Sequence, residues 1–348
     1  FQKTDRGAAG GFVGEVDIMD TWATSSLSPQ IACGWGEDDD LFSRTYPMDM
    51  RPQAHDIIRT WLFSTAVRSH LEEDVAPWRN CALSGWILDP DRKKMSKSKG
   101  NVVTPKGLLD QYGSDAVRYW AANGRPGTDT AFDEGQMKVG RRLTIKILNA
   151  SKFVLTLADD SNPNLDLVTE PLDQALLTRL AALVETATAA FEDFDYARAL
   201  ERTEQFFWGF TDDYVELVKA RAYGSQGPAA AASAHASLAT ALDTLLHLFA
   251  PFLPFVTAEV WSWANSESIH RSQWPDHQVM SSQLNPAIDT TVLDAAAQTL
   301  SEVRKAKTEA KRSLRVMAER VLVTAPREHL DLIELVRSDL MEAGHIST

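Results

Sequence analysis

The sequence is poor in cysteine, lacks a long apolar run and opens without a signal peptide. Its two cysteines, Cys33 and Cys81, are far apart and have no metal-ligand partner nearby. We therefore expect two small buried hydrophobic residues rather than a disulfide or a zinc site. Charge or proline interrupts every apolar stretch, which excludes a membrane-spanning helix. These absences predict a globular protein of the reducing cytoplasm that has no membrane partner.

The chain also lacks a net positive charge. Its formal net charge is -13 at pH 7, which argues against a protein that coats nucleic acid without selectivity. Local stripes of basic residues can still bind RNA whatever the net charge. One such stripe lies within residues 304–315, where six lysines and arginines face one glutamate. Most such stripes are only the solvated face of a helix, so RNA binding and a solvated face both remain possible for this stripe. The same two interpretations apply to a second stripe. That second stripe consists of Lys138, Arg141, Arg142, Lys146 and Lys152.

The composition changes along the 348 residues, a length typical of about two or three domains. Residues 17–126 mix short apolar runs, tryptophans and turns, as an α/β domain does. From Phe132 onward, apolar residues recur at helical spacing, which predicts amphipathic helices. The first of these helices has an apolar stripe opposite its basic residues, formed by Leu143, Ile147, Ala150 and Val154.

Further elements are predicted in the C-terminal half. Long amphipathic helices span residues 172–222 and 229–249, with a glycine-containing turn at 224–228 between them. After another helix, the last segment reads as a helix through Leu314, a strand at 320–324 and a final helix. Large aromatic residues are more often core than ligand wall, so we assign four tryptophans to the core: Trp120, Trp208, Trp261 and Trp263.

Four lysines lie between Lys93 and Lys99, in a chain that is otherwise acidic. Flexible ammonium groups suit a polyphosphate, so this loop predicts an anion site, although a solvated turn or a localisation signal would have a similar composition. Residues 82–88 read as a buried strand, 89–91 as a turn, and Thr104-Pro105 as the start of a helix. The loop therefore lies between a strand and a helix, where open α/β sheets bind ligands.

The wording of this loop carries a family resemblance. Residues 94–98 read Lys-Met-Ser-Lys-Ser, followed by Gly-Asn, and resemble the signature loop that closes over ATP in class I aminoacyl-tRNA synthetases. Residues 17–27 contain Asp-Thr-Trp-Ala-Thr-Ser, and residues 51–61 contain Asp-Ile-Ile-Arg-Thr-Trp; both are similar to elements of the valyl-tRNA synthetase family, in the branch whose bacterial members resemble archaeal ones. With Gly-Ser-Asp-Ala-Val-Arg at 113–118, the resemblance covers essentially the whole chain.

The resemblance implies roles for particular residues. Asp56 would hold the ammonium group of the amino acid, and Trp22, Ile57 and Trp61 would form walls of a dry apolar pocket. Lys94 and Lys97 would be the catalytic cations that stabilise the leaving pyrophosphate. The tRNA-binding residues would be Lys138, Arg141, Arg142 and Lys146. The ATP-binding residues would be His55, Lys94, Met95, Ser96, Lys97 and Ser98.

Two of these assignments have qualifications in the sequence itself. His55 lies in the motif that faces the nucleotide, but a single histidine can equally be a core residue with its hydrogen bonds satisfied. Ala54 stands where the family commonly has glycine, which would let the backbone approach the nucleoside closely. No cluster of metal ligands is visible, so Mg²⁺ is expected to come with ATP.

The resemblance also implies a fold. We expect an α/β region, the second half of a Rossmann-type nucleotide-binding domain, followed by an α-helical anticodon-binding bundle and a small α/β tail. The expected boundaries are 1–100 for the catalytic half-domain, 101–150 for a stem-contact connector, 151–285 for the bundle and 286–348 for the tail. The His-x-Gly-His element of the class does not occur in the sequence. Without it and without an editing domain, the chain is expected to be the C-terminal part of a longer, monomeric enzyme.

The predicted function is ATP-dependent attachment of valine to tRNA(Val) through a valyl-adenylate, with the chain alone inactive. An isoleucyl-tRNA synthetase fragment is the nearest alternative, because one methylene changes pocket affinity only modestly. A tRNA-binding module without catalysis is the alternative from a different functional class.

Overall fold

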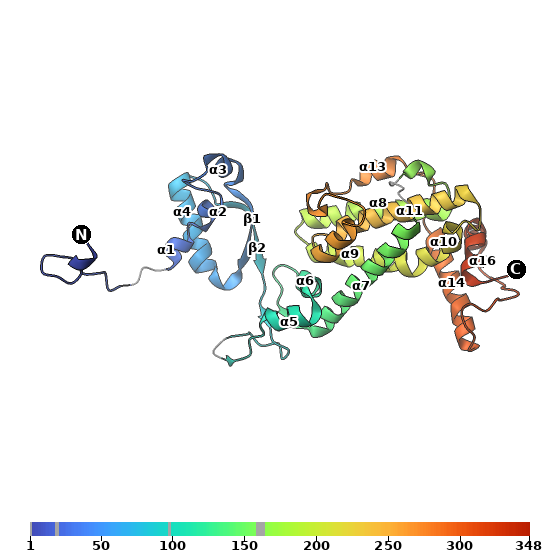
Figure 1. Cartoon of the computed structure of the whole chain (residues 1–348), viewed down its shortest axis with the longest axis horizontal. Helices are drawn as coiled ribbons and strands as arrows, with labels where there is room; N and C mark the ends of the chain where they lie inside the picture. Colours follow the sequence, from blue (N-terminus) through green and yellow to red (C-terminus); the bar gives the residue numbers. More distant parts are fainter. Residues whose placement is uncertain (1, 18–20, 97–98, 158–163) are drawn as a thin grey trace. The chain divides into compact units, whose positions relative to one another are not determined.

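The computed structural model describes residues 2–17, 21–96, 99–157 and 164–348, and the chain divides into two units (Figure 1). Unit 1 comprises Phe1–Lys94 and Pro126–Ala131, and unit 2 comprises Met95–Arg125 and Phe132–Thr348. No helix in the described ranges is long and apolar enough to cross a membrane. The four domain boundaries expected from the sequence remain predictions.

Unit 1 is built around a pair of parallel strands joined by a helix. β1 (Met48–Ala54) pairs with β2 (Trp78–Ser84), from Met48 opposite Trp78 to Ala54 opposite Ser84. α4 (Phe63–Glu73) connects them, as the crossover of parallel strands requires. The other elements of the unit are η1 (Lys3–Asp5), α1 (Thr21–Ser25), α2 (Ser28–Ala32), α3 (Asp39–Thr45), η2 (His55–Ile57), the π-helical turn η3 (Ile58–Leu62), β3 (Ile87–Leu88) and β4 (Thr130–Ala131).

The strand expected at 82–88 is divided in two. β2 ends at Ser84 and β3 begins at Ile87, where it pairs in parallel with β4. Gly85 lies between them, and a Cβ atom built there would be 2.0 Å from the carbonyl oxygen of Thr128. The backbone of a distant segment therefore passes so close to residue 85 that only glycine fits, and the ladder changes partner at this point.

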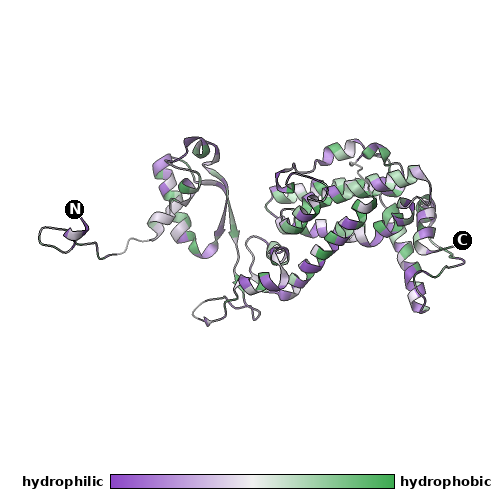
Figure 2. Cartoon of the chain, viewed as in Figure 1, coloured by the Kyte–Doolittle hydropathy of each residue, from purple (hydrophilic) through white to green (hydrophobic). Residues whose placement is uncertain are grey.

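Unit 2 is helical. Its long helices pack around a continuous apolar core, and α11 is coloured mainly as hydrophobic in Figure 2. α7 carries the predicted apolar stripe, with Leu143, Ile147 and Val154 buried, and packs on α6, α11 and α12. The elements are α5 (Pro105–Tyr112), α6 (Ser114–Ala122), α7 (Glu134–Leu157), η5 (Leu165–Leu167), α8 (Pro171–Glu192), α9 (Tyr196–Gly209), the π-helical η6 (Phe210–Tyr214), α10 (Val215–Ala222), α11 (Pro228–Phe249), α12 (Pro254–Trp261), η7 (Ile269–Arg271), α13 (His277–Ser282), α14 (Val292–Glu309), α15 (Arg327–Leu335) and α16 (Arg337–Gly344).

The prediction of one continuous helix over residues 172–222 was wrong. α8 ends at Glu192, Phe194 adopts a left-handed conformation with φ 58°, and the chain reverses into α9. The side chain of Asp195 accepts a hydrogen bond from the Arg198 backbone N–H and caps the new helix. The two helices can therefore pack against each other as a hairpin.

Predictions for the C-terminal segment also differ from the structure. The helix expected through Leu314 ends at Glu309, and Lys311 follows with φ 52°. No strand is assigned at 320–324 within the described part of the chain, because the backbone there finds little pairing beyond a hydrogen bond from the Val321 N–H to the Thr348 carbonyl. A short segment without a ladder partner does not form a strand, whatever its β propensity.

Three burial predictions were wrong. The strand expected at 82–88 is not buried, since Leu83 is 37% and Ile87 46% exposed. Cys33 is buried as expected, but Cys81 is exposed on β2. Trp120, Trp208 and Trp261 are partly buried and pack against the cores, as expected. Trp263, however, is 39% exposed, because it lies just beyond the end of α12.

Candidate active site and RNA-binding surface

A buried aspartate anchors the lysine loop at its start. Asp89 is 7% exposed, and its Oδ1 accepts a hydrogen bond of 2.7 Å from the Lys93 backbone N–H. The Asp89 N–H in turn donates to the Lys93 carbonyl at 2.9 Å, and the Arg92 N–H donates to the Asp89 carbonyl. This closes the predicted turn and fixes the backbone from which Lys94 extends.

The other end of the loop is tied by the Gly-Asn pair that follows the motif. The Ser96 N–H donates to Oδ1 of Asn101 at 3.0 Å, and the Lys99 N–H donates to the Ser96 carbonyl at 3.1 Å. Gly100 has φ 67°, a conformation that side chains disfavour. Met95 and Ser96 are half-buried. Lys97 and Ser98 lie outside the described residues.

Lys94 and Asp56, which the sequence assigned to different substrates, lie next to each other. The Lys94 Nζ is 3.7 Å from Oδ2 of Asp56, and both side chains are close to half exposed. The same ammonium group lies 4.1 Å from the ring centroid of Trp86. The predicted ATP-binding cation and the predicted ammonium-binding carboxylate thus share one place in unit 1.

His55 borders this place. Its Nδ1 is 3.1 Å from the Ser84 carbonyl oxygen, and its ring lies 4.6 Å from that of Trp86. The side chain is half-buried, so it is not a core histidine. Ala54, just before it, has φ -86° and ψ 143°, values that alanine adopts without strain. The replacement of the family's glycine is therefore tolerated by the backbone.

The predicted pocket walls lie on neighbouring elements. Trp61, on η3, is buried, and its Nε1 donates to the Ser25 carbonyl on α1 at 2.7 Å. The guanidinium of Arg51 lies 3.9 Å from the Trp61 ring centroid. Burial lowers the pKa of Arg51 below its ordinary value. Trp22, on α1, and Ile57, on η2, are half-buried, so the structure does not make them core residues.

Arg51 and Trp86 were missed by sequence reasoning. Arg51 precedes the recognised Asp-Ile-Ile motif, and its position over an aromatic ring depends on the pairing of β1 with β2. Trp86 could have been suspected, because a large aromatic residue stands between a strand and the lysine loop.

Some basic residues of the stripe on α7 are bonded to other residues of the chain, and others have no ion-pair partner among the described residues. Arg141 donates to the Gln111 carbonyl at 2.6 Å, and Lys146 pairs with Asp212 at 2.8 Å. Lys138 and Arg142 are exposed and make no ion pair within the described ranges. These two are therefore the stripe's strongest candidates for RNA contact.

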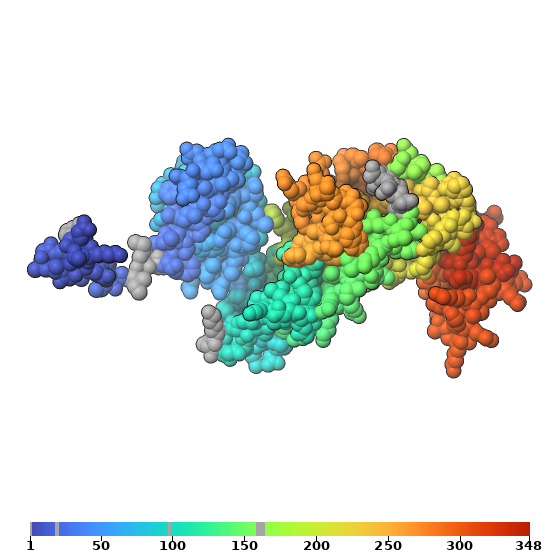
Figure 3. Space-filling model, in the orientation of Figure 1, coloured from blue at the N-terminus to red at the C-terminus, as the bar shows by residue number. Residues whose placement is uncertain are grey.

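The stripe at 304–315 is partly structural. Lys307 is buried and donates to the carbonyls of Leu314, Val316 and Gly344 at 3.1, 2.7 and 2.6 Å, and burial lowers its pKa. The end of α14, with exposed Lys311 and Arg312 just beyond it, projects from the rest of unit 2 (Figure 3).

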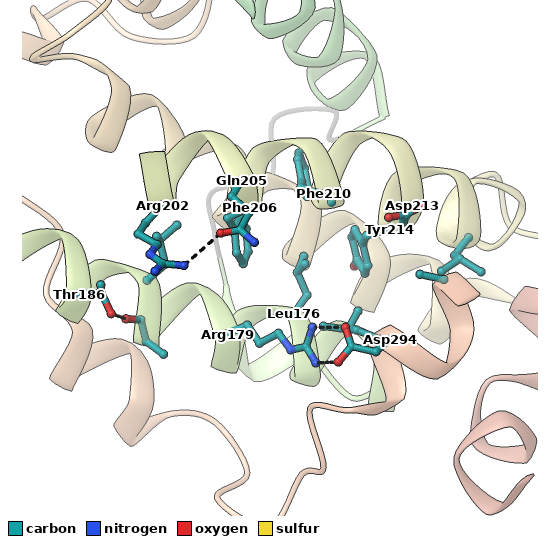
Figure 4. Close-up of a pocket in the computed structure, with 16 residues that line it drawn as sticks. Leu176, Arg179, Thr186, Arg202, Gln205, Phe206, Phe210, Asp213, Tyr214 and Asp294 are labelled. Carbon is teal, nitrogen blue, oxygen red and sulfur yellow. Dashed lines mark hydrogen bonds and ion pairs between the residues drawn. The ribbon is translucent and has the colours of Figure 1, made fainter. Parts of the chain in front are cut away.

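Unit 2 also has a pocket of about 390 Å³ between α8, α9, η6 and α14. Figure 4 shows Arg179 and Asp294 on its lining, paired with each other by two hydrogen bonds of 2.8 and 2.5 Å. Burial, together with the neighbouring Asp212, raises the pKa of Asp213 on its wall. The pocket contains none of the residues predicted from the sequence.

The comparisons with known proteins match both parts of the chain. Residues 3–133 match the family "tRNA synthetases class I (I, L, M and V)", and residues 173–322 match "Anticodon-binding domain of tRNA ligase". The chain thus contains a class I tRNA synthetase region followed by an anticodon-binding domain of the tRNA ligases. A crystal structure of the ternary complex of Agrobacterium radiobacter K84 agnB2 LeuRS-tRNA-LeuAMS shares the fold, with a TM-score of 0.64 over 76% of this chain and 34% of that chain, at 19% identity.

Within this class, the sequence is similar to valine–tRNA ligases along its whole length. It is 58% identical to the enzyme of Thermobifida fusca strain YX, with 100% of this chain and 39% of the relative covered. It is 55% identical to that of Salinispora tropica, with 99% and 42% covered, and 52% identical to that of Leifsonia xyli subsp. xyli, with 99% and 40% covered. The chain thus spans about two fifths of the length of the curated relatives it matches.

Proposed function

We propose that the chain is part of a valine–tRNA ligase, which joins valine to tRNA(Val) through a valyl-adenylate. The observation that carries the proposal is the proximity of Lys94 to Asp56, whose side chains lie 3.7 Å apart in unit 1. The similarity of this whole chain to part of the valine–tRNA ligases supports valine as the amino acid.

In this reaction the carboxylate of valine attacks the α-phosphate of ATP, and pyrophosphate leaves. Negative charge grows on the leaving group, and the ammonium groups of Lys94 and Lys97 would stabilise it. A lysine on a loop suits this role, because its long side chain can follow a group that moves during the reaction. The remaining loop residues and His55 would contact the nucleotide.

Mg²⁺ would enter with ATP. No group of three or more His, Cys, Asp or Glu side chains in the described residues is arranged to hold a metal ion. The phosphates of ATP, which are hard oxygen ligands, would therefore supply most of the coordination. When bound, the ion would neutralise charge on the phosphates.

The tRNA would contact the exposed basic residues of α7 and the helices of unit 2. Lys138 and Arg142 have side chains that can reach phosphates, whereas Arg141 and Lys146 would first have to leave Gln111 and Asp212. We further propose that the enzyme is a monomer that acts in the cytoplasm. We also propose that this chain forms no adenylate by itself, because its sequence contains no His-x-Gly-His element.

Valine-dependent ATP–pyrophosphate exchange by the full-length enzyme tests the proposal. Lys94→Ala should lower the exchange rate by about two orders of magnitude or more, since it removes a transition-state charge partner. Lys97→Ala should do the same. Lys93→Ala, a neighbouring lysine that pairs with Asp91, is the matched control and should stay within a few-fold of wild type. Exchange that depends on isoleucine instead of valine would favour the isoleucyl alternative, and near-normal exchange by Lys94→Ala would contradict the mechanism.

A further inference from the structure

Trp86 contacts two residues of the candidate site without belonging to any recognised motif. The Lys94 ammonium lies 4.1 Å from its ring centroid, and the His55 ring lies 4.6 Å away at an angle of 40°. An ammonium group over a tryptophan face is the strongest arrangement of the cation–π type. The same ammonium also pairs with Asp56, so Lys94 is held by two groups at once. We call Trp86 and Asp56 together the lysine seat.

The backbone of Trp86 is fixed from both sides. Its N–H donates to Oδ1 of Asp129 at 2.8 Å, and its carbonyl accepts from the Thr130 N–H at 2.9 Å. At the preceding residue, Gly85, the backbone of Thr128 comes too close to admit a Cβ atom. A segment distant in sequence therefore determines where the indole ring lies.

The backbone of Lys94 is fixed as well. It forms an isolated antiparallel bridge with Leu88, and the preceding residue, Lys93, is bonded to the buried Asp89. The fold therefore places the backbone positions from which the Trp86 ring and the Lys94 side chain extend. The contact is thus built into unit 1.

Asp56 can neutralise only one ammonium group well at a time. The proposed function assigns this carboxylate to the α-ammonium of the amino acid, yet in the structure the Lys94 ammonium is its partner. Two cations that need the same carboxylate compete, and competition lowers the apparent affinity of each. A contact that holds Lys94 at the Asp56 carboxylate therefore weakens the binding of the amino acid.

We propose that Trp86 is a positioning residue that holds Lys94 against Asp56 while the amino-acid subsite is empty, so that amino-acid binding displaces Lys94 and releases it towards ATP. This inference rests on the proposed function. It gives the enzyme a link between its two substrates: the cation needed for the phosphates leaves the lysine seat when the amino acid arrives. Reciprocity requires that removing the contact between Trp86 and Lys94, with Asp56 left in place, strengthens amino-acid binding.

Valine binding to the full-length enzyme, measured by calorimetry without ATP, tests the inference. Trp86→Leu removes the ring and should tighten valine binding about 2–5-fold, the equilibrium equivalent of an exposed cation–π contact. Lys94→Gln removes the competing cation and should tighten it at least as much. Trp86→Phe keeps an aromatic face and should lie between wild type and Trp86→Leu. Trp35→Leu, which changes an exposed tryptophan far from the motif in sequence, is the matched control and should bind valine as wild type does.

The double variant Trp86→Leu/Lys94→Gln separates positioning from a general structural effect. If Trp86 acts through Lys94, the double variant should bind valine as Lys94→Gln alone does. An equal effect of Trp86→Leu in both backgrounds, or weaker or unchanged valine binding by Trp86→Leu, overturns the inference. A wild-type enzyme that binds isoleucine but not valine would instead refute the proposed substrate, and the same four-variant comparison with isoleucine would still decide whether the lysine seat exists.

Discussion

Arg221 makes a buried ionic cluster whose removal should destabilise the helical unit strongly. Its guanidinium, on α10, is fully buried and donates to both oxygens of Asp173 at 2.7 and 2.8 Å and to Asp339 at 2.9 Å. Asp173 lies on α8 and Asp339 on α16, so one side chain joins three helices. Asp173 also accepts hydrogen bonds from Tyr214 and Ser233. The cation thus compensates two carboxylates that have lost contact with water.

Arg221→Met keeps most of the side-chain volume and removes the charge. Two buried carboxylates then lose their counter-ion, and breaking a buried pair in this way costs about 3–5 kcal/mol of unfolding free energy. For a unit of this size, each kcal/mol corresponds to roughly 2–4 °C, so Tm should fall by about 6–20 °C. Asp339→Asn should cost less, because Arg221 keeps its two bonds to Asp173.

Thermal unfolding of the chain, followed by circular dichroism of its helices, measures the effect directly. Arg202→Met is the matched control, since Arg202 is exposed on α9 and bonds only to Gln205 among the described residues. Exposed substitutions of this kind usually stay within about 0.5 kcal/mol. If Arg221→Met shifted Tm no further than Arg202→Met, the buried cluster would not stabilise the bundle and the reasoning from burial would be refuted.

Two further predictions concern the substrates of the full-length enzyme. Asp56→Asn should weaken valine binding several-fold or more, because the α-ammonium group loses its counter-charge, while ATP affinity stays near wild type in calorimetry. Equal weakening of valine and ATP binding would point to a role in nucleotide binding or to misfolding. Arg142→Glu should reduce tRNA affinity and lower the slope of log affinity against log salt concentration by about 0.7–0.9, the contribution of one phosphate contact. The control Arg79→Glu, in unit 1, should leave both the affinity and the slope unchanged. An unchanged slope for Arg142→Glu would mean that the basic face of α7 is only solvated.

The elements that depend on local sequence could be predicted. The apolar spacing of Leu143, Ile147 and Val154 gave α7, and Pro105 marks the first residue of α5. The break between α8 and α9 also had a local signal, because Asp195 stands where a capping residue is expected, but the long apolar period hid it. Periodicity alone does not report a short reversal between two helices of similar pattern.

The elements that depend on distant segments could not be predicted. The division of the strand at Gly85 requires the backbone of Thr128, and the expected strand at 320–324 lacks a partner for its ladder. The same holds for the candidate site. The motifs assigned Lys94 to ATP and Asp56 to the amino acid. The contact between these two side chains, and that between Lys94 and Trp86, depend on strand pairing that the sequence does not display.

The described part of the lysine motif is held by side chains that are not part of it. Asp89 fixes the backbone of Lys93 before the motif, and Asn101 fixes that of Ser96 within it, each through a short-range hydrogen bond. Cations that accelerate a reaction must interact more strongly with the transition state than with the substrates. Asp89 holds the backbone from which the Lys94 side chain extends, so in the proposed mechanism the loss of Asp89 should impair the chemical step more than substrate binding. Under the proposed function, residues outside the five-residue motif would therefore contribute to its action.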